Sequence, residues 1–244
     1  MLNPVSISIV IPAYNEAGRI TRTLETIRHY LTQTKQQAEV IVVNDGSDDA
    51  TVSIVERLSE DWNQLRLIQN PGNYGKGFSV QHGAMQARGE IVLFSDADLS
   101  APISEMSKLV DPIRQGECDV SFGSRALDRS LIGVHQSKLR ELSGHIYNLF
   151  VRLLTGLPFK DTQCGFKAFR RDVMIPVFER QKITDFGFDP EMLYIAQKRG
   201  LRLKEVPVRW SHAEGTSVHF IRDPLKMFLG LFKILWNQWM GRYR

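Results

Sequence analysis

Hydrophobic and polar residues follow one another along the first half of the chain in a pattern that predicts alternating strands and helices. Apolar runs rich in β-branched residues predict strands at 5–11, 40–43, 65–69 and 91–94. Apolar residues at helical spacing predict helices around 20–31, 52–58 and 78–87. Strands and helices in this order form β-α-β units, so we expect an α/β fold with a mostly parallel central sheet flanked by helices.

The second half has a less regular pattern. It predicts strands at 120–123, 166–169 and 203–208 and helices at 139–154 and 190–199. No internal repeat, low-complexity tract or linker interrupts the sequence. We therefore expect one domain over residues 1–216, composed of the halves 1–124 and 125–216, followed by a C-terminal amphipathic helix within 217–244.

The segment 225–240 is strongly apolar, since 11 of its 16 residues are apolar. Its helix start is predicted at Asp223-Pro224, and its polar stripe consists of Lys226, Gly230, Lys233 and Asn237. A helix of 16 residues is roughly 24 Å long, short for a bilayer core of roughly 30 Å. The helix could pack on the core, form the seam of a homodimer, or lie in a membrane surface. In the last case the interfacial residues would be Phe228, Phe232, Trp236 and Trp239.

Composition is that of an ordinary soluble globular protein, with 43% hydrophobic and 24% charged residues. Two cysteines and no recognisable signal peptide lead us to expect a cytoplasmic protein. Residues 1–124 hold 10 Lys and Arg against 16 Asp and Glu, whereas residues 125–244 hold 21 against 11. The acidic half suits a metal cation, and the basic half suits a phosphate, a nucleic acid or an anionic membrane. No interleaving of aromatic and basic residues supports nucleic acid, so we expect no nucleic-acid partner.

Polar or glycine-rich residues follow each predicted strand of the first half. Ligands of open parallel sheets bind beyond the carboxyl ends of the strands. Tyr14 offers a stacking face for a base, and Asp45 could accept hydrogen bonds from a base or a ribose. Glycines around Lys76 would let the backbone and the ammonium approach a phosphate. The Walker A motif, the Rossmann fingerprint and zinc-ligand spacing are absent from the sequence.

Asp96 and Asp98 directly follow the strand predicted at 91–94. Two carboxylates this close repel each other unless a cation lies beside them. Hard oxygen ligands, completed by phosphate oxygens and water, are typical of a Mg²⁺ or Mn²⁺ site. A solvated turn that caps the next helix is the alternative interpretation.

Six motifs occur in order over almost the whole chain: IPAYNE, VVNDGSDD, NYGKG, DADLS, GSR and DTQCGFKAF. Together they resemble the family 2 glycosyltransferases with the GT-A fold that transfer a sugar to a polyprenyl phosphate. The set is most similar to the dolichyl-phosphate glucosyltransferases, and also to the dolichyl-phosphate mannose synthases. The resemblance implies a nucleotide-sugar donor, either UDP-glucose or GDP-mannose, a polyprenyl-phosphate acceptor and Mg²⁺ or Mn²⁺. Since the apolar C-terminal segment would fit a lipid-linked acceptor, we also expect peripheral association with the cytoplasmic face of the membrane.

The resemblance implies a role for each matching residue. The donor-binding residues would be Pro12, Ala13, Tyr14, Glu16, Asp45, Gly75, Lys76, Asp96, Ala97 and Asp98. The acceptor-phosphate residues would be Arg125, Arg140, Gln163 and Lys167, with Cys164 shaping their pocket. Asp96, Asp98 and Arg125 would be catalytic, and the two aspartates would be the metal ligands. Ser100 stands where mannose synthases can have a metal-binding glutamine, which leaves the third metal ligand open.

We expect the acceptor phosphate to act as its own nucleophile with inversion at the sugar, because a phosphate monoester has a second pKa of about 6. Alternatively, Asp189 or Glu191 could be the base of a transferase that acts on a saccharide hydroxyl. The same segment also fits a helix start, with Asp189 as N-cap and Pro190 as first helical residue. A non-catalytic nucleotide-sugar-binding protein is the remaining alternative.

Overall fold

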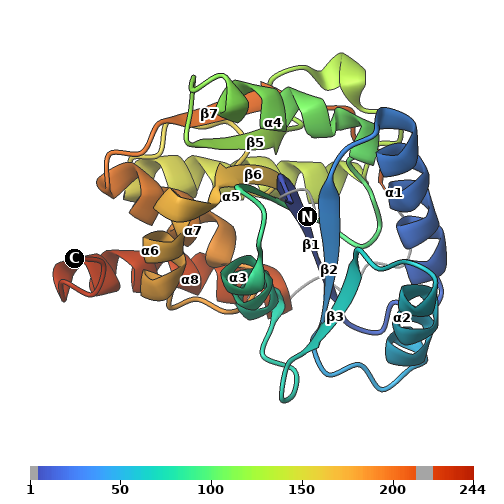
Figure 1. Ribbon diagram of the computed structural model, residues 1–244. Coiled ribbons are helices and arrows are strands. Elements are labelled where there is room, and N and C mark those ends of the chain that lie inside the picture. Colours follow the sequence, from blue (N-terminus) through green and yellow to red (C-terminus); the bar gives the residue numbers. More distant parts are fainter. Residues whose placement is uncertain (1–4, 213–221) are drawn as a thin grey trace.

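The computed structural model describes residues 5–212 and 222–244, and it has an α/β fold built on one seven-stranded sheet (Figure 1). The strands are β1 (Ile7–Ala13), β2 (Ala38–Asn44), β3 (Leu65–Gln69), β4 (Ile91–Ser95), β5 (Val120–Ser124), β6 (Phe166–Arg170) and β7 (Leu203–Pro207). The α-helices are α1 (Ile20–Thr34), α2 (Thr51–Glu60), α3 (Lys76–Gln86), α4 (Met106–Arg114), α5 (Lys138–Thr155), α6 (Arg171–Arg180), α7 (Phe188–Lys198) and α8 (Arg222–Trp239). Short 3-10 helices are η1 (Ile103–Glu105) and η2 (Arg129–Leu131).

The strand order is β3-β2-β1-β4-β6-β5-β7, and every neighbouring pair is parallel except those of β6. Strand β6 is antiparallel to both β4 and β5. Its first residue, Phe166, therefore pairs with Ser95, the last residue of β4. The segment that precedes β6 is thus held at the edge of the sheet where β4 ends.

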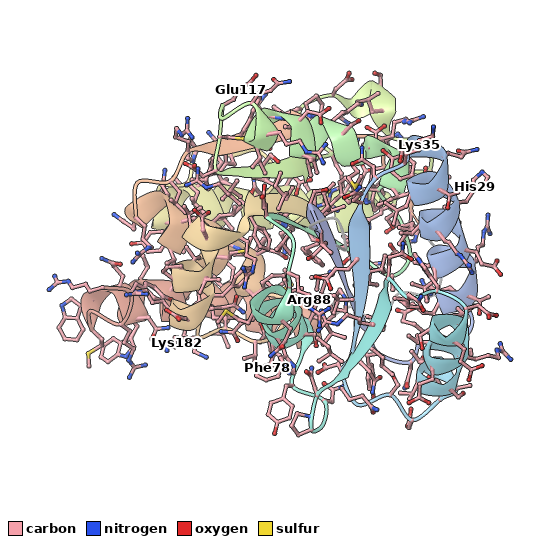
Figure 2. All side chains as sticks on the ribbon, viewed as in Figure 1. His29, Lys35, Phe78, Arg88, Glu117 and Lys182 are labelled. Atoms are coloured by element: carbon pink, nitrogen blue, oxygen red, sulfur yellow. The ribbon has the colours of Figure 1, made fainter. Side chains whose placement is uncertain are left out.

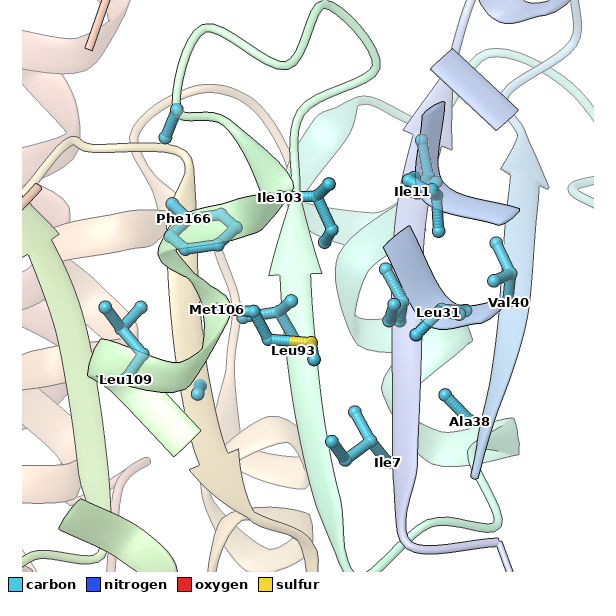
Figure 3. Close-up of a cluster of buried hydrophobic side chains, with 14 of the residues drawn as sticks. Ile7, Ile11, Leu31, Ala38, Val40, Leu93, Ile103, Met106, Leu109 and Phe166 are labelled. Atoms are coloured by element: carbon cyan, nitrogen blue, oxygen red, sulfur yellow. The ribbon is translucent and has the colours of Figure 1, made fainter. Parts of the chain in front are cut away.

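Helices cover both faces of the sheet (Figure 1). One core packs the sheet against α1 and α4, and Figure 3 shows Ile11, Met106 and Phe166 within it. The other core lies on the opposite face, under α3 and α5 to α8. Ile9 of β1 belongs to the first core and its neighbour Val10 to the second. A strand that is buried on both faces needs apolar side chains at successive positions, which explains the continuous apolar runs of the sequence.

The expected fold class and all seven predicted strands are confirmed, with strand bounds that differ by at most two residues. Helices α4 and α6 were not predicted. Each contains a proline, Pro112 and Pro176 respectively. A proline lacks the amide hydrogen that an interior helical position uses, so it obscures a short helix in the sequence. The expected domain boundary at residue 216 lies outside the described residues.

Helix α8 does not turn all of its predicted polar stripe toward solvent. It buries Leu231, Ile234 and the predicted polar-face residue Asn237, while several large apolar side chains remain exposed. The side chain of Asn237 accepts a hydrogen bond from Arg242 and donates one to Tyr243. Packing on the core, one of the three expectations, is therefore confirmed for one face only. Within residues 5–212 and 222–244, the structure contains no helix with the length and hydropathy of a membrane span.

Candidate active site

The loops that follow β1 and β2 are joined by hydrogen bonds at the carboxyl edge of the sheet. The Asn15 amide donates to Ser47 Oγ (2.9 Å), and Asn15 Oδ1 accepts from the Asp48 amide (3.0 Å). The Glu16 amide donates to Thr51 Oγ1 (2.8 Å). Asn15 has a φ of 54°, in the left-handed region that asparagine tolerates better than most residues. These contacts fix the direction in which the β1 loop presents its side chains.

Asp45 organises the next loop of the edge. Its Oδ1 accepts from Asn70 Nδ2 (2.8 Å) and the Tyr74 amide (3.0 Å), and its Oδ2 accepts from the Gly75 amide (2.7 Å). Gly75 has a φ of 97°, and a Cβ there would lie 2.5 Å from the Thr184 carbonyl oxygen. The Asp45 carboxylate thus positions the loop between β3 and α3. Its expected contact with a base stays a prediction.

Lys76 and Asp96 form an ion pair at the end of β4. Lys76 is the first residue of α3, and its Nζ lies 2.6 Å from Asp96 Oδ1 and 5.3 Å from the centre of the Phe94 ring. Burial raises the pKa of Asp96, an effect that Lys76 opposes and Asp98 reinforces. Asp96 also touches the loop before β6, because its amide donates to the Gly165 carbonyl (3.1 Å). A Cβ on Gly165 would lie 1.9 Å from Asp96 Oδ2, so any larger residue at this position would displace the carboxylate.

Asp98 lies in a tight turn next to Asp96. Its Oδ1 accepts from the Ser100 amide (2.8 Å), and Leu99 between them has a φ of 48°. A leucine in the left-handed region is strained, and such strain is concentrated at functional sites. Glu16 is the third carboxylate of this group. Burial raises the pKa of Glu16 to about 7, Arg19 lowers it, and Asp98 and Asp96 raise it further.

The residues present fit a hard divalent cation that is held jointly with another molecule. Among the described side chains, no set of three or more His, Cys, Asp and Glu residues is arranged to hold a metal by itself. Glu16 Oε2 and Asp96 Oδ1 are buried, and each lies 2.6 Å from a cationic nitrogen, of Arg19 and of Lys76 respectively. Carboxylate oxygens with spare coordinating capacity, completed by phosphate oxygens and water, are what Mg²⁺ and Mn²⁺ use.

The raised pKa of Glu16 predicts that stability depends on pH. Its folded-state pKa of about 7 exceeds the ordinary 4.5, so the folded state retains a proton that the unfolded state releases. The contribution is complete below pH 4.5 and decreases as the pH rises through 7. The measured quantity is the free energy of unfolding of the native chain minus that of Glu16→Gln, in chelator-treated samples. This difference should fall by about 1 to 2 kcal/mol from about pH 5 to about pH 8, a size that allows for solvent screening. Urea denaturation of both proteins across this range measures the difference, and parallel curves would contradict the prediction.

Arg125 follows β5 and is held by a bidentate pair. Its Nε and Nη2 donate to Asp161 Oδ2 (2.7 Å) and Oδ1 (2.9 Å), and its guanidinium lies 5.4 Å from the centre of the Trp210 ring. Burial alone would raise the pKa of Asp161, but the Arg125 guanidinium lowers it to about 2. The Arg125 pKa is raised by Asp161 against the effect of burial, and Asp96 contributes in the same direction. This arginine is therefore a fixed positive charge near the paired aspartates.

A basic pocket opens beside Arg125, between the β5 end and α5. Three of the four predicted acceptor residues line it: Arg125, Arg140 and Gln163. Other lining residues, which the sequence did not single out, include Arg129, His145, Asn148, Lys160, Asp161 and Trp210. Asp161 could have been found, because it begins the motif DTQCGFK and an acid is the natural partner of a buried arginine. For Trp210 the sequence offered no signal.

Lys167, the fourth predicted acceptor residue, lies elsewhere. Its side chain is fully buried, and Nζ donates to Asp189 Oδ1 and to the Cys164 carbonyl oxygen, both at 2.5 Å. The position of Lys167 therefore does not fit its expected direct contact with the acceptor phosphate. The helix start expected at Asp189 is also displaced, because α7 begins at Phe188 with Gly187 as N-cap and Pro190 as its third residue.

Glu191 is also fully buried, and its carboxylate is hydrogen-bonded within the protein interior. It accepts hydrogen bonds from the Lys182 and Ile183 amides and from the Tyr243 hydroxyl (2.5 Å). Burial raises the pKa of Glu191, and the hydrogen bond from Tyr243 lowers it. The Ile183 segment continues into Thr184, whose carbonyl accepts from the Phe78 amide of α3 (3.1 Å). The C-terminus is thereby connected to the loop that carries Lys76.

Replacing Tyr243 by phenylalanine should destabilise the fold by about 1 to 3 kcal/mol, because a buried carboxylate loses a hydrogen bond. Thermal or urea unfolding measures the loss. Tyr194→Phe is the matched control, since this buried tyrosine makes no hydroxyl hydrogen bond within the described residues. Equal stabilities for the two variants would argue against the Tyr243–Glu191 contact.

The remaining predicted donor residues gather at the same edge. Pro12 and Ala13 are the last residues of β1, and Tyr14 beyond them is exposed. Ala97 is buried, and its carbonyl accepts from the Thr23 hydroxyl (2.5 Å). The fold thus brings together the ends of β1, β2 and β4 with the start of α3, while the individual roles stay predictions.

Comparison with solved structures assigns the fold. Mannosyl-3-phosphoglycerate synthase from Rubrobacter xylanophilus matches with a TM-score of 0.70 at 18% identity, over 98% of this chain and 75% of that one. Glucosyl-3-phosphoglycerate synthase from Mycobacterium tuberculosis, solved in complex with Mn²⁺, UDP and glucosyl-3-phosphoglycerate, matches with a TM-score of 0.69 at 19% identity. That match covers 94% of this chain and 79% of the other. The fold is the GT-A fold of sugar transferases, as expected.

Sequence comparison gives the family. The profile of glycosyl transferase family 2 matches residues 8–178. A dolichyl-phosphate beta-glucosyltransferase from Trichomonas vaginalis is 35% identical, over 94% of this chain and 73% of the relative. The Homo sapiens enzyme of the same name is 31% identical, over 87% of this chain and 69% of the relative. The chain belongs to glycosyl transferase family 2, and it is a glycosyltransferase.

Proposed function

We propose that this enzyme is a metal-dependent, inverting transferase that moves a hexose from a nucleotide-sugar to a polyprenyl phosphate. The names of its relatives support a lipid-phosphate acceptor and favour glucose over mannose. UDP-glucose is therefore the first donor to test, and GDP-mannose the second.

The observation that carries the proposal is the position of the basic pocket relative to the paired aspartates. The two sites share the short segment before β6: Gln163 lines the basic pocket, and Gly165 contacts the Asp96 carboxylate. An anionic acceptor in the pocket would thus stand next to a donor at the aspartates. Guanidinium groups such as those of Arg125 and Arg140 match the geometry of a phosphate.

Asp96 and Asp98 would hold the divalent ion, which would act as a Lewis acid on the donor diphosphate. Lys76 adds a positive charge on the same side, at the N-terminus of α3, where backbone amides and the helix dipole favour anions. Preorganised charge of this kind at a leaving group is usually the largest catalytic contribution.

The acceptor phosphate would supply its own nucleophile. The two carboxylates considered as bases are occupied, Asp189 by Lys167 and Glu191 by Tyr243 and two amides. An anionic phosphate oxygen needs no proton removed before it attacks the sugar carbon as the diphosphate leaves. This arrangement supports a phosphate acceptor over a saccharide hydroxyl.

A donor screen tests the function. The chain is incubated with radiolabelled UDP-glucose or GDP-mannose, a polyprenyl phosphate and Mg²⁺ or Mn²⁺, and the label is counted in the organic phase. Label in the organic phase supports the proposal. Transfer only to added saccharides, or donor binding without any transfer, would overturn it in favour of the other two hypotheses.

The acceptor pocket predicts a selective defect. Replacing Arg140 by glutamine should raise the KM for the polyprenyl phosphate roughly tenfold, because a charge-assisted hydrogen bond contributes about 1.5 kcal/mol or more. The KM for the nucleotide-sugar should stay unchanged. Arg88→Gln is the matched control, since Arg88 is an exposed arginine on the chain before β4 (Figure 2). A change in the donor KM alone would contradict the assignment.

The location at the cytoplasmic face of the membrane is part of the proposal. A polyprenyl phosphate keeps its hydrocarbon chain in the bilayer, so the transferase must work at a membrane surface.

A further inference from the structure

We propose that α5 and α8 together form a membrane-docking surface that seats the protein on an anionic bilayer and presents the basic pocket to the headgroup layer. The inference deepens the proposed function and rests on its lipid-phosphate acceptor. It differs from the sequence analysis, which considered membrane contact for the C-terminal helix alone and as one of three possibilities.

Exposed apolar side chains are concentrated on these two helices. Ten of the 15 exposed large hydrophobic residues of the described chain lie on α5 or on α8 and the residue after it. They are Leu139, Leu142, Ile146, Leu149, Leu153, Leu229, Phe232, Trp236, Trp239 and Met240, each 48% to 75% exposed. Exposed apolar side chains gathered in this way, rather than scattered singly, mark an interaction site.

On α5 the exposed residues form one stripe, because 139, 142, 146, 149 and 153 are spaced by three and four positions. Tyr147 and Val151 face the core. Phe150 lies between the core side and the stripe, and its ring packs edge-on against Phe228 of α8, with centroids 4.8 Å apart. The stripe therefore continues outward from the contact between the two helices.

Helix α8 repeats this arrangement. Leu231 and Ile234 are buried, Phe228 lies next to them around the helix, and the exposed residues follow beyond Phe228. With about 3.6 residues per turn, both stripes lie on the outer side of the Phe150–Phe228 contact. The two stripes meet at this contact, and on α8 a shallow depression is lined by Phe232, Leu235, Trp236 and Trp239 together with Lys233.

Cations border this surface along both outer edges. Exposed Lys138 and Arg152 flank the stripe of α5, and exposed Lys226 and Lys233 flank that of α8. Residues 226–244 contain no acidic residue, and the one acid of α5, Glu141, is paired with Arg129 and His135. Apolar side chains with tryptophans and a cationic rim are typical of helices that lie in an anionic membrane interface.

The basic pocket lies just beyond one of these edges. Gly144, His145 and Asn148 line it from α5, on the flank opposite to α8. A path around α5 from the stripe therefore crosses the cationic edge and reaches the pocket. A lipid whose hydrocarbon chain lies under the stripe would have its phosphate at the depth of this edge, within reach of the pocket.

Charge also favours a bilayer over a second copy of the chain. A two-fold dimer would bury the surface against itself, since such an interface uses the same patch on both subunits. It would bring the cationic edges of both copies together, and residues 226–244 offer them no acidic partner. An anionic lipid surface complements the same edges.

Vesicle co-sedimentation tests the proposal. The native chain should sediment with vesicles of phosphatidylcholine and phosphatidylglycerol, and less with phosphatidylcholine alone. The triple variant Leu142→Gln, Ile146→Gln, Leu149→Gln should lose about tenfold in binding, because interfacial affinity scales with buried apolar area. Removing the edge charges by Lys226→Gln and Lys233→Gln should weaken binding to the anionic vesicles only. Lys35→Gln, at the end of α1 and far from α8 in Figure 2, is the matched control and should bind as the native chain does.

Activity separates this surface from the active site. With a short-chain, water-soluble isoprenyl phosphate, the triple variant should be as active as the native chain, whereas with a long-chain acceptor in vesicles it should be about tenfold slower. If the native chain is inactive with both acceptors, the proposed function fails while the sedimentation result still decides the docking surface. Unchanged sedimentation of the triple variant would overturn the proposal. So would a native dimer in analytical ultracentrifugation that the triple variant dissociates and that does not bind vesicles.

Discussion

Alanine in place of Asp98 should lower kcat/KM by roughly a hundredfold to a thousandfold, the scale seen when one preorganised electrostatic group is lost. The side chain lies in a strained turn close to Asp96, where the proposed divalent ion would offset the charge of both aspartates. Steady-state rates and a titration with Mn²⁺, followed by water-proton relaxation, measure the loss of turnover and of metal affinity.

Asp98→Asn separates charge from turn geometry. Its amide oxygen can still accept the Ser100 amide hydrogen, which Asp98 Oδ1 does at 2.8 Å, but the charge is gone. We expect this variant to be nearly as inactive as the alanine variant and to unfold like the native chain. Asp111→Ala removes a half-exposed aspartate of α4 and should leave both rate and metal affinity unchanged. Native-like turnover and Mn²⁺ affinity in Asp98→Ala would remove the metal assignment.

Gly165→Ala should reduce turnover by about a hundredfold although it adds only a methyl group. The new Cβ would lie 1.9 Å from Asp96 Oδ2, so the carboxylate must leave its place beside Lys76. Overpacking of this kind destabilises a fold by about 1 to 3 kcal/mol. The measurements are kcat/KM, Mn²⁺ affinity and urea unfolding of the variant.

Two further variants decide whether the loss acts through Asp96. In the double variant Gly165→Ala, Asp96→Ala the clash has no target, so its activity should match that of Asp96→Ala alone, a non-additive result. Gly230→Ala is the matched control, because its nearest contact would be an ordinary 3.7 Å and an alanine favours the helix. If the double variant is much worse than Asp96→Ala, Gly165 has a role apart from Asp96.

Replacing Asp189 alone cannot test whether it is a catalytic base, because its charge is paired in the protein interior. Lys167 and Asp189 satisfy each other in the interior. Replacing one alone leaves an unpaired charge, which costs about 3 to 5 kcal/mol. A loss of activity in Asp189→Asn would therefore not identify a catalytic base. The double variant Lys167→Met, Asp189→Leu removes both charges and should retain substantial activity if the phosphate is the nucleophile.

The position of much of the candidate site could be predicted from the chain because its signals are local. Asp45 and the Asp96–Asp98 pair follow apolar runs that can only be buried strands, and the ends of parallel strands meet at one edge of a sheet. Lys167 was expected at the acceptor phosphate, whereas the structure buries it, because β6 is covered on both faces by packing that the sequence does not report. Its partner Asp189 lies 22 positions away, a separation that a local pattern does not report.

The sequence by itself determined the α/β class, the seven strands and the residues at their ends, since hydrophobic periodicity and polar breaks depend only on neighbours along the chain. It also determined that 225–240 forms a helix with a broad apolar face. Only the tertiary structure decided that α8 turns its polar-stripe residue Asn237 inward and leaves that face exposed beside the stripe of α5. Periodicity states which residues share a face of a helix, but the packing of distant segments decides which face is covered.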